Sequence, residues 1–332
     1  MITLTTDRLD PIPQGVFRDF AQSGRSRDLH ENLLHTLPAM NAVEVAGRPS
    51  AFDPLAFPFT VAAWNLERCL FPEDSAAHIA ATGAFVVLLS EMDDGMARTA
   101  QRNTTAEVAR ELSMTYAYGV EFIELGLGSE TEREFCKDDF NARGFHGNSL
   151  MASVPLTKPF LIRLWGERIW LSHDPGQLRV GERCAVGAVI ETQSGPFVAV
   201  SMHLESVATA AYRERQVSEL IDAVESAFPS LPILIGGDLN TGNHAGGDWE
   251  AETLFAMAAA RGFKHHGGPI DQMTTRPSLI TRWPDRAMKL DWFLSRGLEI
   301  STSAIISSLD GDGRPLSDHD LITCRIEGLI AA

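Results

Sequence analysis

The chain has little cysteine. Its four cysteines, Cys69, Cys136, Cys184 and Cys324, lie far apart and form no CxxC or CxxxC spacing. Zinc knuckles and dithiol redox motifs need such close pairs, so the sequence indicates neither. Free thiols in a reducing compartment are the simplest interpretation.

Long hydrophobic runs are also missing. No stretch approaches the ~20 apolar residues that span a bilayer. The first residues, MITLTTDRLDPIPQG, place acidic residues and prolines where a signal peptide has its apolar core. We therefore expect no transmembrane segment and a cytoplasmic protein.

Positive charge is scarce. Lys and Arg number 28 against 44 Asp and Glu, which gives a formal net charge of -16. Such a chain repels polyanions at long range, and it has no basic run that could neutralise nucleic-acid phosphates. An acidic enzyme can still bind one phosphate if metal ions supply positive charge locally. Nucleic acid is thus the less favoured partner, and no protein partner is indicated.

The remaining composition is that of an ordinary globular protein. Hydrophobic residues make up 44% of the 332 residues and charged residues 22%, enough to bury a sizeable core without disulfides. Residues 1–55 mix short helical patterns with proline and glycine. We expect them to form an N-terminal extension packed on one globular unit, residues 56–332.

From Phe59 onward, short β-rich runs alternate with amphipathic helices. The expected strands are 59–65, 84–89, 116–125, 149–153, 185–191, 197–203, 232–235, 290–294, 300–306 and 321–326. The expected helices are 72–81, 104–112, 208–227 and 249–260, and Arg213 is placed on the solvent face of the third. These strands are too many for one open sheet. Two packed sheets with helices on their outer faces would cover both faces of each. Two long segments, 126–147 and 163–183, are interpreted as a substrate-shaping rim.

The most informative segment is LPILIGGDLNTG, residues 231–242. An apolar strand presents Asp238 and Asn240 at its end, and residues two apart in an extended stretch face the same side. A capped turn would use the same residue types. The pattern therefore indicates either a functional site or a turn.

Three further segments end strands on polar residues. In VAAWNLE an expected strand ends on Asn65, in FVVLLSEMD a second ends on Glu91, and VAVSMHLES repeats the pattern with His203. A buried apolar run that ends in an acidic residue is a common way to present a metal ligand. The alternatives are an ordinary strand end and a core histidine.

Near the C-terminus, RPLSDHDLI places Asp318 and His319 directly before an apolar strand. The preceding KLDWFLS puts Asp291 on an otherwise apolar strand, where an unpaired carboxylate would be costly. A histidine would be a good partner for it. A solvated turn is the alternative for the SDH segment alone.

Seven segments in this order together resemble the endonuclease/exonuclease/phosphatase superfamily, also called DNase I-like. They are WN at 64–65, SE at 90–91, HGNSLMAS at 146–153, SMHLE at 201–205, GGDLN at 236–240, LDWFLS at 290–295 and SDHD at 317–320. The resemblance covers roughly residues 59–326. It implies an α+β fold, a four-layer αββα sandwich of two mixed β-sheets flanked by helices. It also implies one or two Mg²⁺ or Mn²⁺ ions.

The resemblance assigns roles by motif position. Glu91 is similar to the principal metal ligand, with Asn65 and Asp318 near the same cation. Asp238 and Asn240 match the pair that positions the attacking water and contacts the phosphate or a second cation. His319 matches the histidine bonded to the strand aspartate, here Asp291, and His203 matches a second phosphate-facing histidine. Asn148 and Arg183 are candidate substrate-binding residues. The histidines interpreted as surface or supporting residues are His146, His173, His244, His265 and His266.

These roles suit metal-assisted attack of water on a phosphate ester, with Asp291 keeping His319 cationic. The acidic balance disfavours an abasic-site endonuclease. The absence of disulfides disfavours a secreted nuclease, and the lack of visible Lys/Arg clusters disfavours an inositol phosphatase. A small or lipid-type phosphodiester or phosphomonoester is the expected substrate. The alternatives are a Mg²⁺-dependent nuclease on DNA or RNA and a non-catalytic scaffold.

Overall fold

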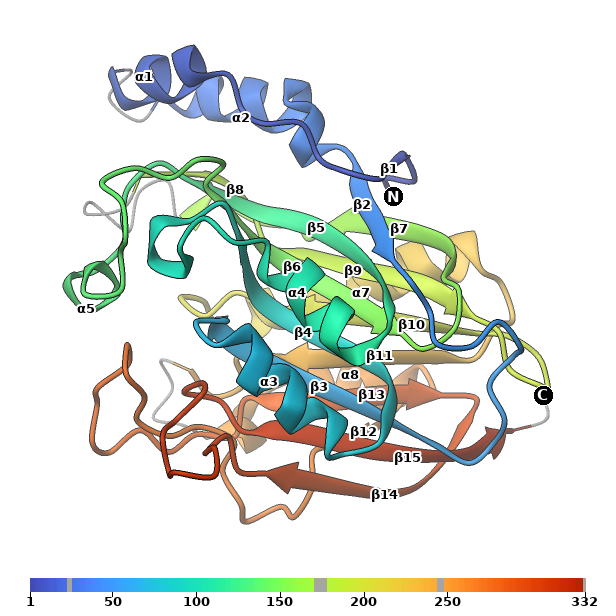
Figure 1. Cartoon of the computed structure of the whole chain (residues 1–332). Coiled ribbons are helices and arrows are strands. Elements are labelled where there is room, and N and C mark those ends of the chain that lie inside the picture. The colour runs from blue at the N-terminus through green and yellow to red at the C-terminus, as the bar shows by residue number, and fades with distance from the viewer. Residues whose placement is uncertain (23–25, 170–177, 244–247, 331–332) are drawn as a thin grey trace.

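Two β-sheets form the centre of the molecule. The structure is a computed structural model that describes residues 1–22, 26–169, 178–243 and 248–330 (Figure 1). Within those ranges the larger sheet has nine strands, ordered β1-β2-β5-β6-β4-β3-β15-β14 with β8 paired to β5. The smaller sheet has six, ordered β12-β13-β11-β10-β9-β7. The strand bounds are β1 Thr5–Thr6, β2 Val43–Gly47, β3 Phe59–Arg68, β4 Ala84–Asp94, β5 Thr115–Glu124, β6 Phe145–Ala152, β7 Thr157–Arg163, β8 Arg179–Gly181, β9 Cys184–Ile190, β10 Phe197–His203, β11 Ile233–Asp238, β12 Lys264–His266, β13 Asp291–Arg296, β14 Leu298–Ile306 and β15 Leu321–Leu329.

Helices cover the outer faces of the sheets. The helix bounds are α1 Gln14–Gln22, α2 Arg27–Thr36, α3 Pro72–Ala80, α4 Thr104–Leu112, α5 Glu130–Arg133, α7 Ala210–Ala227 and α8 Leu254–Ala260, with 3-10 turns η1 Pro38–Met40, η2 Ala97–Thr99 and η3 Trp249–Ala251. One apolar cluster joins α2, α3 and α4 to the larger sheet, a second lies between the sheets, and a third joins α7 and α8 to the smaller sheet. This layering confirms the predicted αββα sandwich. Among the described helices, none is long and apolar enough to cross a membrane.

The expected strands and helices correspond to observed elements, with shifted ends. The expected helix 249–260 is divided into η3 and α8, because Glu252 adopts extended backbone angles between them. Strands β1, β2, β7, β8 and β12 were not expected. The sequences of the last three, TKPFLIR, RVG and KHH, are short or interrupted by a proline and carry little apolar alternation.

The N-terminal residues contribute to the larger sheet. β2 pairs antiparallel with β5, and β1 pairs parallel with β2 at the edge of that sheet. In Figure 1, α1 and α2 lie beyond this edge. The division of the chain at residue 55 stays a prediction.

Helix α7 corrects one expectation about solvent exposure. Thr209 caps the helix, since its side chain accepts a hydrogen bond from the Tyr212 N–H. Arg213, expected to face solvent, is fully buried and forms an ion pair with Glu252. The helical pattern could not show this, because the partner Glu252 directly follows η3, 39 residues along the chain.

Candidate active site

The smaller sheet places three of the candidate residues in one row. In the parallel pair of β10 and β11, His203 is the partner of Asp238, and in the antiparallel pair of β11 and β13, Asp238 is the partner of Asp291. Adjacent strands lie about 4.8 Å apart, so the three side chains start as neighbours at one end of this sheet.

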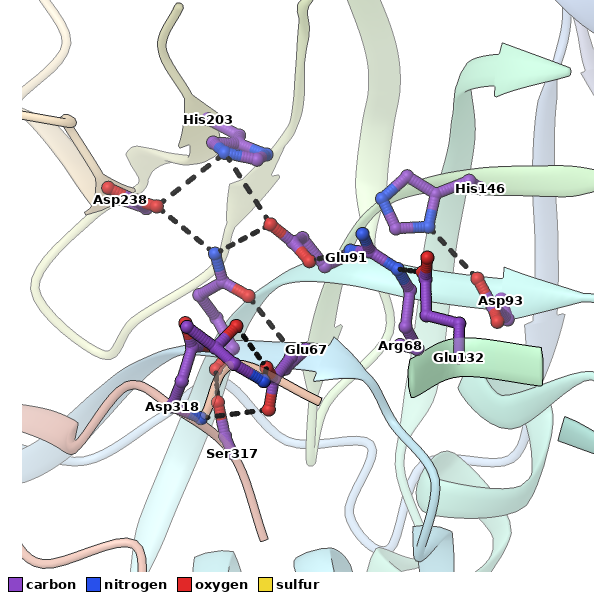
Figure 2. A network of polar contacts seen from close by, with 12 residues as sticks. Glu67, Arg68, Glu91, Asp93, Glu132, His146, His203, Asp238, Ser317 and Asp318 are labelled. Atoms are coloured by element: carbon purple, nitrogen blue, oxygen red, sulfur yellow. Dashed lines mark hydrogen bonds and ion pairs between the residues drawn. The ribbon is translucent and has the colours of Figure 1, made fainter. Parts of the chain in front are cut away.

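The larger sheet supplies the others. Asn65 on β3 pairs with Ser90 on β4, which puts Asn65 beside Glu91, and Asp318 and His319 directly precede β15, the other neighbour of β3. Asn65 joins the two sheets, because its Nδ2 donates to Glu91 Oε1 and to Asp238 Oδ2, both at 3.1 Å. Figure 2 shows His203 between Glu91 and Asp238, with Nε2 3.9 Å from Glu91 Oε1 and 3.5 Å from Asp238 Oδ2.

His319 and Asp291 form a hydrogen-bonded pair. The distance from His319 Nδ1 to Asp291 Oδ2 is 2.9 Å, and His319 Nε2 lies 3.7 Å from Asp238 Oδ2. Burial disfavours the imidazolium, but the charges of Asp291, Asp318 and Asp238 outweigh it and raise the pKa of His319 well above 6.5. His319 is therefore held cationic near neutral pH, with Nε2 on the side of Asp238.

The backbone at the site is tightly constrained. Gly237 has φ 139°, and a Cβ there would lie 2.1 Å from the Met202 carbonyl oxygen. Glu91 and Asn240 also adopt positive φ, 59° and 49°. This conformation is strained for residues other than glycine, and residues strained in this way concentrate at functional sites. Asn240 is further held by its Nδ2, which donates to the Leu204 carbonyl oxygen at 3.0 Å.

Glu67 belongs to the site but was not predicted from the sequence. Its Oε2 accepts a hydrogen bond from the Asp318 N–H at 3.1 Å (Figure 2). Its Oε1 accepts from the Ser278 and Thr281 hydroxyls, both at 2.7 Å. Burial and the nearby charge of Asp318 raise the pKa of Glu67 to about 8. The WNLE segment contains Glu67, but in a regular strand it would face the same side as Asn65 without indicating a role.

Among the described residues, four arginines line the pocket, and the sequence had indicated only Arg183. They are Arg68, Arg179, Arg183 and Arg286. The earlier expectation that no arginine cluster exists was wrong, because these residues come from segments far apart in the sequence. Arg68 pairs with Glu91, and Arg286 Nη2 lies 2.9 Å from Asp318 Oδ2. Burial raises the pKa of Glu91, but the charges of Arg68, His203 and His146 outweigh burial and hold it well below 4.5.

A buried network of charges supports one side of the pocket. Arg98 donates to Asp93, Glu124 and Glu132 at 2.7–2.9 Å, and Arg68 Nε donates to Glu132 at 2.7 Å. His146 lines the pocket and its Nδ1 lies 2.9 Å from Asp93 Oδ1 (Figure 2). His146 is thus a buried supporting residue; His265 and His266 lie on β12, and His173 and His244 fall outside the described residues.

The two candidate substrate-binding residues lie at different depths. Arg183 lines the pocket, with Nη1 2.8 Å from His203 Nδ1. Asn148 is fully buried behind the pocket wall, where its Nδ2 donates to Glu121 Oε2 at 2.9 Å and to the Cys184 carbonyl oxygen at 2.8 Å. A direct contact between Asn148 and substrate stays a prediction.

The pocket has a volume of about 280 Å³. Its rim includes His146, Arg179 and Arg183 from the two segments expected to form it, and also Ile280, Thr281 and Trp283 from a third segment that was not expected. Trp283 is 66% exposed. The long connection from β12 to β13 thus contributes one wall.

The residues present fit a hard divalent cation. Glu67, Glu91 and Asp318 supply carboxylates and Asn65 an amide, and oxygen is the ligand that Mg²⁺ and Mn²⁺ prefer. The guanidinium groups of Arg68 and Arg286 balance the negative charges of Glu91 and Asp318, as a bound cation would. Among the described residues, Asp238, Asp291 and His319 have ligand atoms that all lie within 4.8 Å of one another. A hydrogen bond already joins Asp291 and His319, so the set around Glu91 is the candidate site for a hard cation.

Comparison with known proteins decides the family. A sequence model described as the Endonuclease/Exonuclease/phosphatase family matches residues 62–319. The chain belongs to this family. Its members hydrolyse phosphoester bonds and include phosphatases, phosphodiesterases and nucleases. They generally depend on divalent metal ions. A search of curated proteins gave no match.

Solved structures of this family share the fold. An endonuclease/exonuclease/phosphatase from Beutenbergia cavernae is 18% identical, with a TM-score of 0.60 over 83% of this chain and 72% of that chain. The human Nocturnin catalytic domain with bound sulfate is 14% identical, with a TM-score of 0.56 over 86% and 96%. Danio rerio TDP2 complexed with a single-strand DNA product is 16% identical, with a TM-score of 0.53 over 82% and 100%.

Proposed function

We propose that this protein hydrolyses a small-molecule phosphate ester by metal-assisted, in-line attack of water on phosphorus. The observation that carries the proposal is the convergence of Glu91, Asp238 and His319 from two sheets on one pocket of about 280 Å³. Phosphoryl hydrolysis needs neutralised phosphate oxygens, an oriented water and support for the leaving oxygen. This pocket contains a residue suited to each task.

Glu91, Asp318 and Asn65 would hold Mg²⁺ or Mn²⁺, and Glu67 lies close enough to join them. When bound, the cation would neutralise charge on the phosphate oxygens. The donor set is compatible with either ion, and with one ion or two.

Asp238 is suited to orient the attacking water and accept its proton. Its two oxygens are fixed, because the Asn240 N–H donates to Oδ1 at 2.8 Å and Asn65 Nδ2 donates to Oδ2 at 3.1 Å. Cationic His319, positioned by Asp291, would stabilise the negative charge that develops on the phosphate and on the leaving oxygen as its bond to phosphorus breaks. His203 and Asn240 would contact the remaining phosphate oxygens.

The substrate is a small or lipid-type phosphodiester or phosphomonoester. A pocket of this size suits a small molecule, and the formal net charge of -16 opposes binding of a polynucleotide. TDP2 was solved with single-strand DNA, so a nuclease is the alternative that a test must separate. A cytoplasmic location stays a prediction.

The proposal is tested by assaying the purified protein with Mg²⁺ or Mn²⁺ on bis-p-nitrophenyl phosphate, p-nitrophenyl phosphate, sphingomyelin, nucleotides and plasmid DNA. Asp238→Asn and His319→Asn are each expected to lower kcat at least ~100-fold, as for the loss of a general acid or base. His35→Asn changes an exposed histidine on α2 and serves as the control. Plasmid nicking with a steep salt dependence would favour the nuclease, and full activity in Asp238→Asn would refute the assigned site.

A further inference from the structure

Two of the pocket arginines lie on one wall, around the same aromatic ring. The guanidinium carbon of Arg179 is 5.4 Å from the centroid of Phe122, and that of Arg183 is 5.6 Å from it. Both arginines line the pocket. Arg183 is the inner one, because its Nη1 lies 2.8–3.0 Å from the ring nitrogens of His203.

Buried carboxylates hold both guanidinium groups in place. Arg183 Nη1 donates to Glu121 Oε1 at 2.5 Å, and Arg179 Nη2 lies 3.3 Å from Glu124 Oε1. Glu124 is itself bound by Arg98 at 2.7 Å. An arginine anchored in this way loses little side-chain entropy when it binds an anion, so the wall is preorganised.

These two arginines differ from the other pair in the pocket. Arg68 and Arg286 are paired with Glu91 and Asp318, the proposed metal ligands. Arg183 and Arg179, beside Phe122, are instead held by Glu121 and Glu124, which are not proposed metal ligands. The positive charge of that wall is therefore independent of the metal.

Both arginines of this wall have carboxylates behind them. Arg183 pairs with Glu121 and its Nε lies 3.5 Å from Glu205 Oε2, and Arg179 pairs with Glu124. A guanidinium carries five N–H donors in a planar fork, more than one carboxylate takes up, so an arginine held from behind can also bind an anion. Two such arginines beside the reacting phosphate suit a substrate with a further anionic group.

We propose that Arg179 and Arg183 form a second anion subsite beside the reacting phosphate. The substrate is accordingly a small molecule with a second anionic group, a phosphate or a carboxylate, close to the scissile phosphate. Arg179 is the specificity-determining residue, because it lies on the same wall as Arg183 but does not contact His203. This inference rests on the proposed function for the identity of the reacting group, but the subsite itself can be tested without turnover.

The test is calorimetry on the metal-free protein, where no metal-assisted hydrolysis interferes. Adenosine 3′,5′-bisphosphate and adenosine 5′-monophosphate are compared, since they differ by one phosphate. The bisphosphate is expected to bind about 10- to 100-fold more tightly, as for an added charge-assisted contact. Arg179→Gln should remove that preference, and Arg179→Lys should keep part of it.

Arg282→Gln is the matched control. Arg282 is an exposed arginine on the neighbouring loop that pairs with Glu134 and does not line the pocket. It should leave the preference unchanged. Equal affinity for the two ligands in the wild type, or an unchanged preference in both Arg179 variants, would overturn the subsite. If the preference exists but no phosphate ester is hydrolysed with metal, the proposed function fails and the subsite stands.

Discussion

At the residue scale, the candidate site depends on a glycine that contributes no functional group. Gly237 pairs with Met202 across β11 and β10, and the next residue on β11 is Asp238. The backbones approach so closely that a Cβ at Gly237 would lie 2.1 Å from the Met202 carbonyl oxygen, at a φ that side chains rarely adopt. The position of Asp238 is therefore fixed by the absence of a side chain beside it.

Gly237→Ala is expected to lower the free energy of unfolding by about 2 kcal/mol or more, because the strands must separate or the backbone must change conformation. It should also lower kcat, since Asp238 moves with the strand. Urea denaturation and the ester assay measure the two effects. Gly311→Ala is the control, because a Cβ at Gly311 meets nothing within 4 Å. A Gly237→Ala protein as stable and active as this control would contradict the account.

At the scale of single elements, α7 is tied to the loop after β11 by one buried ion pair. The side chains of Arg213 and Glu252 are each 1% exposed. Glu252 Oε1 also accepts a hydrogen bond from the Gly242 N–H at 2.8 Å, close to the GGDLN segment. The pair thus links the helix covering the smaller sheet to the loop that carries Asn240.

Glu252→Gln is expected to destabilise the protein by about 3–5 kcal/mol, because it leaves the Arg213 charge buried without a counter-ion. The exposed pair of Arg215 and Glu219 on the same helix offers a comparison, with side chains 53% and 46% exposed. Glu219→Gln should cost less than ~1 kcal/mol. The free energy of unfolding of both variants is measured by chemical denaturation. Equal losses for Glu252→Gln and Glu219→Gln would show that burial of the first pair does not affect stability.

Helix α2 is joined to β8 by a neutral histidine. The Gly181 N–H lies 3.1 Å from His30 Nε2, and His30 is 1% exposed. Burial and the positive charge of Arg168 lower the pKa of His30 to about 4. A folded pKa below the unfolded value of about 6.5 means that the unfolded chain takes up the proton first. This group therefore costs stability as the pH falls from 7 to 4.

The size of this effect is about 2–3 kcal/mol between pH 7 and pH 4. His30→Gln removes the titrating group and isolates it from other acid effects. Urea denaturation at several pH values measures the free energy of unfolding of both proteins. The difference in favour of the wild type over His30→Gln should shrink as the pH falls from 7 to 4. Parallel stability curves for the two proteins would contradict the assignment.

The sequence predicted elements better than contacts. Each of Asn65, Glu91 and Asp238 comes at the end of an apolar run, and His319 precedes one, so local pattern and motif order indicated them together. Arg179 and Arg286 have no such local signal. They reach the pocket only because strands and loops far apart in the chain are brought together, and an isolated arginine in a loop is more often on the surface. The burial of Arg213 was missed for the same reason.

At the scale of the whole molecule, an acidic protein gathers positive side chains in one pocket. The formal net charge is -16, yet among the described residues four arginines and three histidines line one cavity of about 280 Å³, together with four carboxylates. The outer field repels polyanions, whereas the pocket attracts a small anion at short range. This contrast is the physical basis for expecting a small phosphate ester as the substrate.

Metal dependence tests the central claim most directly. The purified protein would be stripped with a chelator and titrated with Mn²⁺ in a calorimeter, and the same samples assayed on bis-p-nitrophenyl phosphate and p-nitrophenyl phosphate, with Glu91→Gln beside the wild type. We predict that turnover disappears on stripping, returns in proportion to bound Mn²⁺, and that Glu91→Gln loses both binding and turnover. Unchanged turnover in the stripped protein, or normal Mn²⁺ binding by Glu91→Gln, would contradict a metal site at Glu91.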